Sequence, residues 1–216
     1  MFKFRLGQRN KPIKILCLGA HCDDIEIGCG GSLLRILEEY QKVEVYWIVF
    51  SSIGERGHEA RTSAHLFLHN AAVKSVIFKD FQDGFFPYIG SDIKNYFEDL
   101  KNTISPDIIF THSGHDLHQD HRLISELTWN TFRNHFILQY EIIKYDGDLG
   151  VPNLFIQLND KHCRNKIQYL MSAFKSQRQR PWFTEDSFLS MMRIRGIESN
   201  APEKFAEAFY CRKMVF

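Results

Sequence analysis

The sequence predicts an α/β fold, with a mostly parallel sheet covered by helices on both faces in three Rossmann-like layers. Two observations support this: apolar runs of strand length alternate with segments of helical periodicity, and the first four runs are almost continuously apolar. Continuous apolar runs are typical of parallel strands buried on both faces. Alternating strands and helices imply right-handed crossovers. We expect a single domain over residues 1–216, a length that suffices for one enclosed core.

Six segments are predicted as strands. They share a high content of aliphatic and aromatic residues and cover residues 13–20, 43–51, 75–81, 107–112, 141–146 and 153–158. Segments between them carry apolar residues at helical spacing and are predicted as helices over residues 32–40, 58–71, 92–104 and 121–135. The C-terminal part is expected to be a helical and β extension of the same domain.

The charge balance and the cysteines limit the class of protein. Lys and Arg number 27 against 26 Asp and Glu, and the one short basic run lies at 175–180, so we expect no nucleic-acid partner. No apolar run reaches the roughly 18 to 20 residues of a membrane span, and residues 1–14 lack the apolar region of a signal peptide. Five cysteines without CxxC spacing indicate reduced thiols and a cytoplasmic protein. The oligomeric state stays open, with a homo-oligomer as one alternative.

Two polar clusters directly follow the first and fourth predicted strands. The first holds His21, Asp23, Asp24 and Glu26, and the second is HSGHDLHQDHR over 112–122. Ligands of parallel sheets bind at the carboxyl ends of the strands, so we expect the two clusters to close one site. Imidazole and carboxylate ligands without thiolates suit zinc, and three protein ligands plus water are typical of a catalytic site.

The spacing within the first cluster suggests separate tasks for its residues. In a tight turn after a strand, His21 and Asp24 can reach one point while Asp23 points to one side, free to act as a base. A third ligand must come from elsewhere in the chain. His121, at the start of the helix after the fourth strand, can approach from the neighbouring strand end.

Both clusters resemble motifs of the PIG-L or LmbE-like zinc-dependent N-deacetylases, which remove acetyl groups from N-acetylglucosamine-type substrates. The first family motif reads Ala-His-Pro-Asp-Asp with Glu and a glycine pair following, and this chain has AHCDDIEIGCGG over 20–31. The second is His-x-Asp-His, here HQDH over 118–121. The similarity continues through the helix around Arg61, the segment YEIIKYDGDLGVPN, the pair SQ at 176–177 and AEAF at 206–209, so it covers most of the chain.

The resemblance implies an LmbE-like fold and one Zn²⁺ per chain, with these site residues: the metal ligands His21, Asp24 and His121, the general base Asp23, and the catalytic pair His118 and Asp120. His118 would face the developing oxyanion and Asp120 would orient it. The implied reaction is hydrolysis of the N-acetyl group of an N-acetylglucosamine-type sugar or glycoconjugate. Zinc suits it, because zinc lowers the pKa of its water towards roughly 7 and polarises a carbonyl. Whether Asp23 or His118 protonates the leaving amine stays open.

Three further residues are candidates for substrate binding, each with a structural alternative. A family arginine at the kind of position held by Arg61 faces the substrate, and the alternative is a surface salt bridge. Asp83 either holds a sugar hydroxyl, as a family acid in that region does, or is a turn residue ahead of Gly84. Asp116 either contacts the substrate or caps its loop.

Four other residues near the motifs carry weaker expectations. Cys22 replaces the family proline, which removes a fixed φ and puts a thiol beside a ligand; we expect it not to bind metal. For Glu26 we favour a supporting role over a catalytic one. His112 and His115 are expected to lie on a mobile loop without binding metal.

Three alternative functions compete with a sugar deacetylase. Glycines after the first strand suggest a nucleotide-binding oxidoreductase or transferase of Rossmann type, but the GxGxxG spacing and an acidic end of the second strand are missing. The same hydrolysis on a non-sugar amide stays open. A binding protein without turnover is disfavoured, because such a relative could lose Asp23 or His118 without cost to folding.

Overall fold

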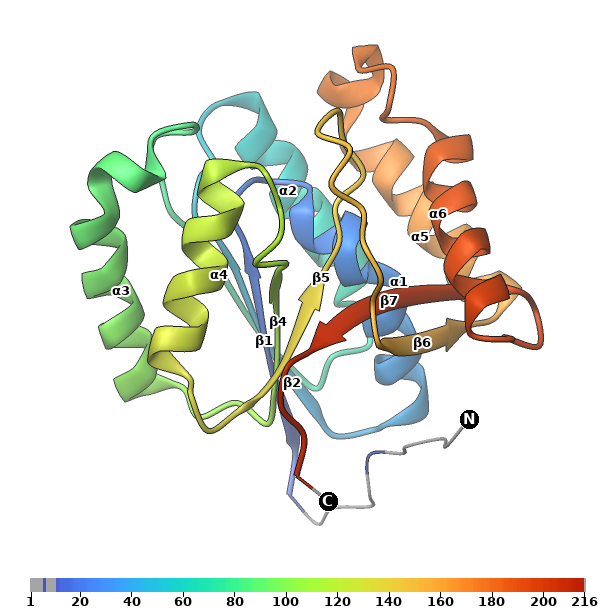
Figure 1. The fold of residues 1–216 in the computed structure, drawn as a ribbon, viewed down its shortest axis with the longest axis horizontal. Helices are drawn as coiled ribbons and strands as arrows, with labels where there is room; N and C mark the ends of the chain where they lie inside the picture. The colour runs from blue at the N-terminus through green and yellow to red at the C-terminus, as the bar shows by residue number, and fades with distance from the viewer. Residues whose placement is uncertain (1–5, 7–10, 216) are drawn as a thin grey trace.

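A seven-stranded sheet forms the centre of the structure, a computed structural model that describes residue 6 and residues 11–215. The strand order is β3-β2-β1-β4-β5-β7-β6 (Figure 1). The strands are β1 (Ile13–Gly19), β2 (Val43–Val49), β3 (Val73–Phe78), β4 (Ile108–His112), β5 (Phe136–Tyr140), β6 (Leu154–Leu158) and β7 (Phe205–Cys211). Strands β1 to β5 pair in parallel, whereas β7 is antiparallel to both β5 and β6. The prediction of a mostly parallel α/β sheet is confirmed.

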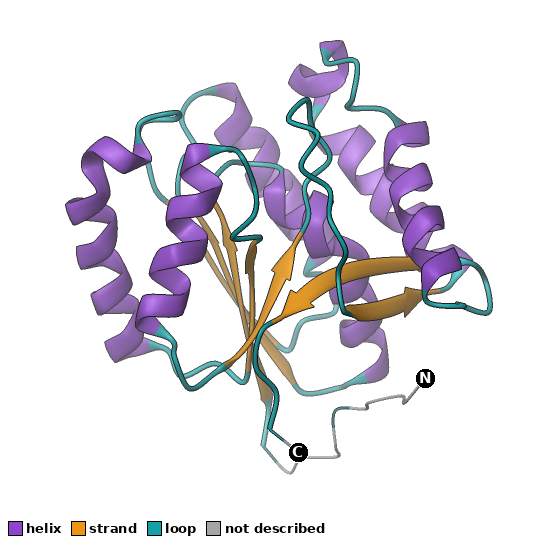
Figure 2. Cartoon of the chain, in the orientation of Figure 1, coloured by secondary structure: helices purple, strands orange, loops and turns teal. Residues whose placement is uncertain are grey.

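Helices cover both faces of this sheet (Figure 2). They are α1 (Asp24–Glu39), α2 (Glu55–Phe67), α3 (Gly90–Thr103), α4 (Gln119–Thr131), α5 (Asp160–Ala173) and α6 (Glu185–Glu198), with short 3₁₀ helices η1 (Phe86–Ile89) and η2 (Lys175–Gln179). On one face α3 and α4 contribute Phe97 and Ile124 to a core. On the other, α1, α2 and α5 contribute Leu33, Phe67 and Leu170 to a second core. The three predicted layers are therefore present.

Strand β1 illustrates why a central parallel strand is apolar at every position. Ile15 and Cys17 lie in the core beneath α1, α2 and α5, while Leu16 and Leu18 lie in the core beneath α3 and α4. All four side chains are 0% exposed. Successive side chains of a strand point to opposite faces, so burial on both faces leaves no place for a polar side chain.

The predicted strand at 141–146 is wrong, because these residues form a loop and the strand in this region is β5, immediately before them. Charged side chains explain the difference. The Glu141 carboxylate pairs with Arg195 at 2.8 Å, and the Lys144 ammonium lies 3.1 Å from Asp116. Both are partners outside the sheet. The C-terminal strand β7 was expected only in general terms, as part of an extension.

Helix α1 begins at Asp24 and not at residue 32, so the glycines of the first motif lie inside the helix. A Cβ atom on Gly28 would lie 2.2 Å from Cδ2 of Tyr140, and one on Gly30 would lie 2.6 Å from Cε1 of Phe67. The glycines therefore allow two aromatic rings to pack directly on the helix backbone. These glycines do not lie in the turn before α1, where the first glycines of a dinucleotide-binding motif stand, which argues against the nucleotide-binding alternative.

The sequence predicts neither a signal peptide at residues 1–14 nor a membrane-spanning segment. The N-terminal stretch that was compared with signal peptides lies mostly outside the described residues. Within the described part of the chain, no helix combines the length and the apolar character that crossing a bilayer requires.

Close packing of α6 on β7 makes Gly196 sensitive to substitution. A Cβ atom there would lie 2.2 Å from the carbonyl carbon of Lys204 and 2.4 Å from the amide nitrogen of Phe205. Because both are backbone atoms, Gly196→Ala should shift β7 and lower the free energy of unfolding by about 1–3 kcal/mol in urea titrations. Gly90→Ala is the matched control, since its Cβ would meet only Leu123 methyl groups at 3.9 and 4.0 Å. Equal stability of the two variants would contradict this account of the packing.

Candidate metal and catalytic site

The two polar clusters meet at the carboxyl edge of the sheet, because β1 and β4 are parallel neighbours, and Asp83 of the loop after β3 reaches them. The turn between β1 and α1 is closed by a hydrogen bond from the His21 backbone N–H to Asp24 Oδ2, at 2.6 Å. Asp24 is the first residue of α1, where unpaired backbone N–H groups favour a negative charge. His118 is the N-cap of α4, which brings Asp120 and His121 into the first turn of that helix.

The three predicted metal ligands point at one another. His21 Nδ1 lies 3.1 Å from His121 Nε2 and 3.5 Å from Asp24 Oδ2, and His121 Nε2 lies 3.5 Å from Asp24 Oδ1. All three residues are buried. A tetrahedral zinc ion with ligands at roughly 2.0–2.1 Å separates its ligand atoms by about 3.3 Å. The spacing of the three side chains therefore suits such an ion.

The outward nitrogens of the two imidazoles define what their inward nitrogens offer. His121 Nδ1 lies 2.9 Å from Asp116 Oδ2, and His21 Nε2 lies 3.1 Å from Asp120 Oδ2 and 3.0 Å from Asp83 Oδ1. A carboxylate only accepts, so each outward nitrogen carries the proton and each inward nitrogen of a neutral ring presents a lone pair. Two lone pairs 3.1 Å apart require a cation between them, either a proton or a metal ion.

Ionisation of the groups around this point agrees with a cation-binding centre. Burial alone would lower the pKa of His21, but the carboxylates of Asp120, Asp24 and Asp83 raise it well above its usual value. Burial and the neighbouring His112 lower the pKa of His121 to about 4. Burial opposes ionisation of Asp24, yet His121 and His112 hold its pKa well below the usual range. A proton on His21 then takes the place between the rings that suits a metal ion.

Asp23 is buried beside this centre with its two oxygens in different surroundings. Oδ1 accepts a hydrogen bond from Arg56 Nη2 at 2.8 Å. Oδ2 is also buried and has no hydrogen-bond partner among the described residues. Burial raises the pKa of Asp23, although the Arg56 guanidinium acts against it. A carboxylate with one free, desolvated oxygen is suited to proton abstraction.

His118 lies edge-on to His21, with the ring centroids 4.9 Å apart. Its Nδ1 accepts the backbone N–H of Asp120 at 3.3 Å, so the neutral ring carries its proton on Nε2. Burial and the neighbouring His21 lower the pKa of His118, which favours this neutral form. The ring can therefore donate a hydrogen bond from Nε2.

The expected contact between the Asp120 carboxylate and His118 is not made. Asp120 Oδ2 instead lies 3.1 Å from His21 Nε2 and accepts the Gly84 N–H at 2.7 Å, while Oδ1 accepts the Phe86 N–H at 3.1 Å. The backbone N–H of Asp120 donates to His118 Nδ1, whereas the Asp120 side chain binds the loop after β3. Asp120 thus orients the predicted ligand His21 and is hydrogen-bonded to the backbone of the loop after β3.

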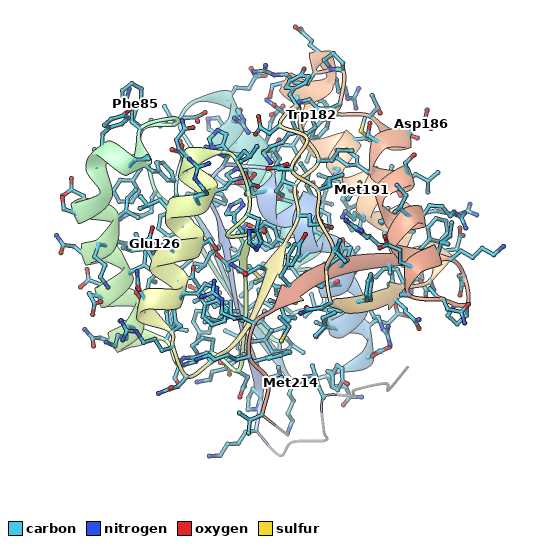
Figure 3. All side chains as sticks on the ribbon, in the orientation of Figure 1. Phe85, Glu126, Trp182, Asp186, Met191 and Met214 are labelled. Atoms are coloured by element: carbon cyan, nitrogen blue, oxygen red, sulfur yellow. The ribbon has the colours of Figure 1, made fainter. Side chains whose placement is uncertain are left out.

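The three predicted substrate-binding residues lie in different places. The Asp83 side chain is 58% exposed, and its Oδ1 lies 3.0 Å from His21 Nε2. It belongs to the loop that continues to Phe85, which is labelled at the upper left of Figure 3. Asp116 is buried, with one oxygen on His121 Nδ1 and the other accepting the His118 N–H at 2.8 Å, which favours a positioning role. Arg61 is exposed, with its guanidinium 4.4 Å from the Phe78 ring centroid, and is not brought to the cluster.

Two residues of the site, Arg56 and Lys144, have no role in the sequence predictions, and the prediction that His112 lies on a mobile loop is wrong. Arg56 reaches Asp23 from the same helix on which Arg61 was expected to act. His112 is not on a mobile loop, since it ends β4, is 0% exposed and lies 3.2 Å from Asp24 Oδ2. Lys144 holds the loop after β5 against Asp116. Lys144 could have been found from its place in the family-like segment YEIIKYDGDLG. The burial of His112 could have been predicted, because the predicted strand at 107–112 ends at this residue.

Cys22 and Glu26 are both buried next to the predicted ligands in the sequence. The Cys22 thiol is buried in the core and donates to the Ser51 carbonyl at 3.3 Å, and burial raises its pKa to about 12. The sulfur atom is thus directed at a backbone carbonyl, and its surroundings favour the neutral thiol. Glu26 is fully buried, and burial raises its pKa well above the usual value, which favours a neutral carboxyl group beneath the site.

Comparison with known proteins identifies relatives of this site and fold. Residues 16–132 match the family described as PIG-L, GlcNAc-PI de-N-acetylase. The uncharacterized deacetylase YaiS of Escherichia coli (strain K12) is 34% identical over 125 residues, which are 54% of this chain and 66% of that protein. The match therefore spans slightly less than two thirds of the relative's length.

Solved structures of the same fold include proteins of different activities. The N,N'-diacetylchitobiose deacetylase of Pyrococcus horikoshii is 20% identical with a TM-score of 0.69, covering 92% of this chain and 83% of that one. GalB, the 4-carboxy-2-hydroxymuconate hydratase of Pseudomonas putida KT2440, is 15% identical with a TM-score of 0.74, covering 94% and 98%. These similarities show a shared fold. Membership of a family rests on the sequence match instead, which runs from β1 through α4 over more than half of the residues. By this match the chain belongs to the PIG-L family of deacetylases.

Proposed function

We propose that this chain is a zinc-dependent hydrolase that removes the acetyl group from an N-acetylated amino sugar or glycoconjugate. One observation carries the proposal: His21 Nδ1 and His121 Nε2 lie 3.1 Å apart and each lies 3.5 Å from an oxygen of Asp24, beside a buried Asp23 oxygen that has no hydrogen-bond partner among the described residues. Family membership supports the deacetylase chemistry.

Zinc is the metal that the donor set favours. Two imidazole nitrogens and one carboxylate oxygen leave a fourth position for water or substrate, as in catalytic zinc sites. When bound, the ion lowers the pKa of a nearby water and polarises an amide carbonyl. Asp116 and Asp120 would support the ligands, because each orients one imidazole through its outward nitrogen.

The protein side chains divide the proton transfers of the reaction. Asp23 Oδ2 accepts a proton from the attacking water, since Oδ1 is engaged by Arg56. His118 donates from Nε2 to the carbonyl oxygen as negative charge develops on it, because its Nδ1 already accepts the Asp120 N–H. The amine leaves after a proton reaches its nitrogen, and there are two candidate donors: Asp23, which then carries the proton taken from the attacking water, and His118 when its ring is doubly protonated.

The substrate assignment rests on chemistry at the rim of the site. Asp83 combines an exposed carboxylate with a place beside His21, which suits a sugar hydroxyl as hydrogen-bond donor. The Pyrococcus neighbour acts on a diacetylated disaccharide, which supports an N-acetyl sugar. We place the protein in the cytoplasm, because its five cysteines are unpaired. Hydrolysis of a non-sugar amide is the alternative within the same chemistry.

Acetate release from a panel of N-acetyl sugars, free, nucleotide-linked and lipid-linked, tests the proposed function. We expect zinc-loaded protein to release acetate from at least one of them. Chelated protein should lose that activity, because the zinc ion is needed to polarise the amide carbonyl and to activate the water. Return of activity on adding zinc back controls for unfolding during chelation. Acetate release only from non-sugar amides would overturn the sugar assignment and support the alternative. No acetate release from any amide would reject the proposed function.

Replacing Asp23 separates a base from a ligand. Asp23→Asn should keep about one zinc per chain by elemental analysis, because Asp23 contacts Arg56 and not the ligand atoms. Its kcat for acetate release should fall by about 10²- to 10⁴-fold, the range typical of general acid–base groups. Loss of zinc in this variant would show that Asp23 is a ligand.

Replacing His121 should have the opposite effect on metal content. His121→Ala removes the nitrogen that lies 3.1 Å from His21 Nδ1, so zinc per chain should fall well below one after dialysis. His115→Ala is the matched control, because His115 is an exposed histidine of the loop that leads into α4. Unchanged zinc in both variants would rule out His121 as a ligand.

A further inference from the structure

Arg56 occupies a place in the site that neither the motifs nor the comparisons assign. It is the second residue of α2, and its side chain is 32% exposed. Its Nη2 lies 2.8 Å from Asp23 Oδ1, and its Nη1 lies 3.8 Å from Asp83 Oδ2. One guanidinium therefore bridges the proposed general base and the proposed substrate-binding carboxylate.

The bridge closes a ring of polar side chains around the turn after β1. Asp83 Oδ1 lies 3.0 Å from His21 Nε2, its other oxygen faces Arg56, and Arg56 holds Asp23, which is two residues from His21 in the chain. The ring joins the loop after β1, the loop after β3 and the start of α2. A change in the position of any member would be passed to its neighbours.

The two oxygens of Asp23 are made unequal by this contact. Arg56 engages Oδ1, whereas Oδ2 is buried without a protein partner among the residues that the structure describes. A carboxylate free to rotate could offer either oxygen to a reacting water. Held at Oδ1 by a planar, charged donor, it offers one oxygen in one direction.

A positive charge is also needed at this point. Asp23 and Asp24 are adjacent carboxylates, 4% and 3% exposed, at the start of one helix. Burying a carboxylate without a partner is costly. The His21 backbone N–H and the His21 imidazole lie 2.6 and 3.5 Å from Asp24 Oδ2 and compensate that group, and Arg56 compensates Asp23.

We propose that Arg56 is a positioning residue of the deacetylase: it holds Asp23 Oδ1 so that Oδ2 alone faces the reacting water, and it links this base to Asp83. The inference rests on the proposed function. It assigns Arg56 a task distinct from substrate binding, which the resemblance implied for Arg61 on the same helix.

Steady-state kinetics of Arg56→Gln and Arg56→Lys test the proposal on the zinc-loaded enzyme with the best substrate of the panel. Arg56→Gln should lower kcat by about 10²-fold, as misplacement of a reacting group by an ångström does, with KM within about twofold and zinc unchanged. Arg56→Lys should retain intermediate activity, since one ammonium keeps the charge but not the planar fork. Arg164→Gln is the control, because it removes an exposed ion pair with Asp160 on α5.

Two kinetic outcomes would overturn the proposal. An unchanged kcat in Arg56→Gln would show that Asp23 needs no support from Arg56. A raised KM with unchanged kcat would show instead that Arg56 binds substrate. A wild-type protein without activity on the whole panel would reject the proposed function. The contact between Arg56 and Asp23 can then still be tested by a measurement that does not depend on turnover.

That measurement is a double-mutant cycle of unfolding in urea, at one saturating zinc concentration, with Asp23→Asn, Arg56→Gln and the double variant. Arg56→Gln should raise the unfolding equilibrium constant about fivefold or more beyond its effect in the Asp23→Asn background, because it leaves a buried carboxylate unpaired only when Asp23 is present. Additive effects would overturn the assigned contact whether or not the protein is a deacetylase.

Discussion

The buried carboxylate of Asp24 is the constraint around which this site is organised. It lies at the first residue of α1, 3% exposed, where a carboxylate without partners would be strongly unfavourable. Its oxygens accept the His21 backbone N–H at 2.6 Å and face His112 at 3.2 Å and His121 at 3.5 Å. Residues far apart in the chain converge because this one charge requires donors or a cation beside it.

Support for the imidazoles passes outward through further carboxylates. Asp116 fixes His121 and is itself paired with Lys144, which also binds Asp148 at 2.5 Å. The loop after β5 is thereby held over the loop after β4. On the other side Asp120 fixes His21 and accepts two backbone N–H groups of the loop after β3. The loops around the site are thus linked through the groups that orient its ligands.

Helix α1, which carries Asp24, is anchored at its middle to the last strand. Glu207 of β7 accepts the backbone N–H groups of Gly31 and Ser32 at 2.8 and 2.6 Å, and Lys166 of α5 donates to Glu207 and to the Ile27 carbonyl. A side chain on Gly31 would contact Glu207 at 3.0 Å, so the glycine permits this approach. The antiparallel end of the sheet thereby helps to hold the helix that bears the candidate metal site.

The sequence by itself determined the fold class, the two polar clusters and their place after β1 and β4, because burial on both sheet faces and the run of charged residues at strand ends are local signals. Only the tertiary structure decided the partners of Asp120, the burial of His112, and the presence of Arg56 in place of Arg61 beside Asp23. It also decided that residues 141–146 form a loop and that β7 lies between β5 and β6 in the sheet. These outcomes depend on the direction of side chains across loops and on pairing between distant strands, which spacing along the chain does not encode.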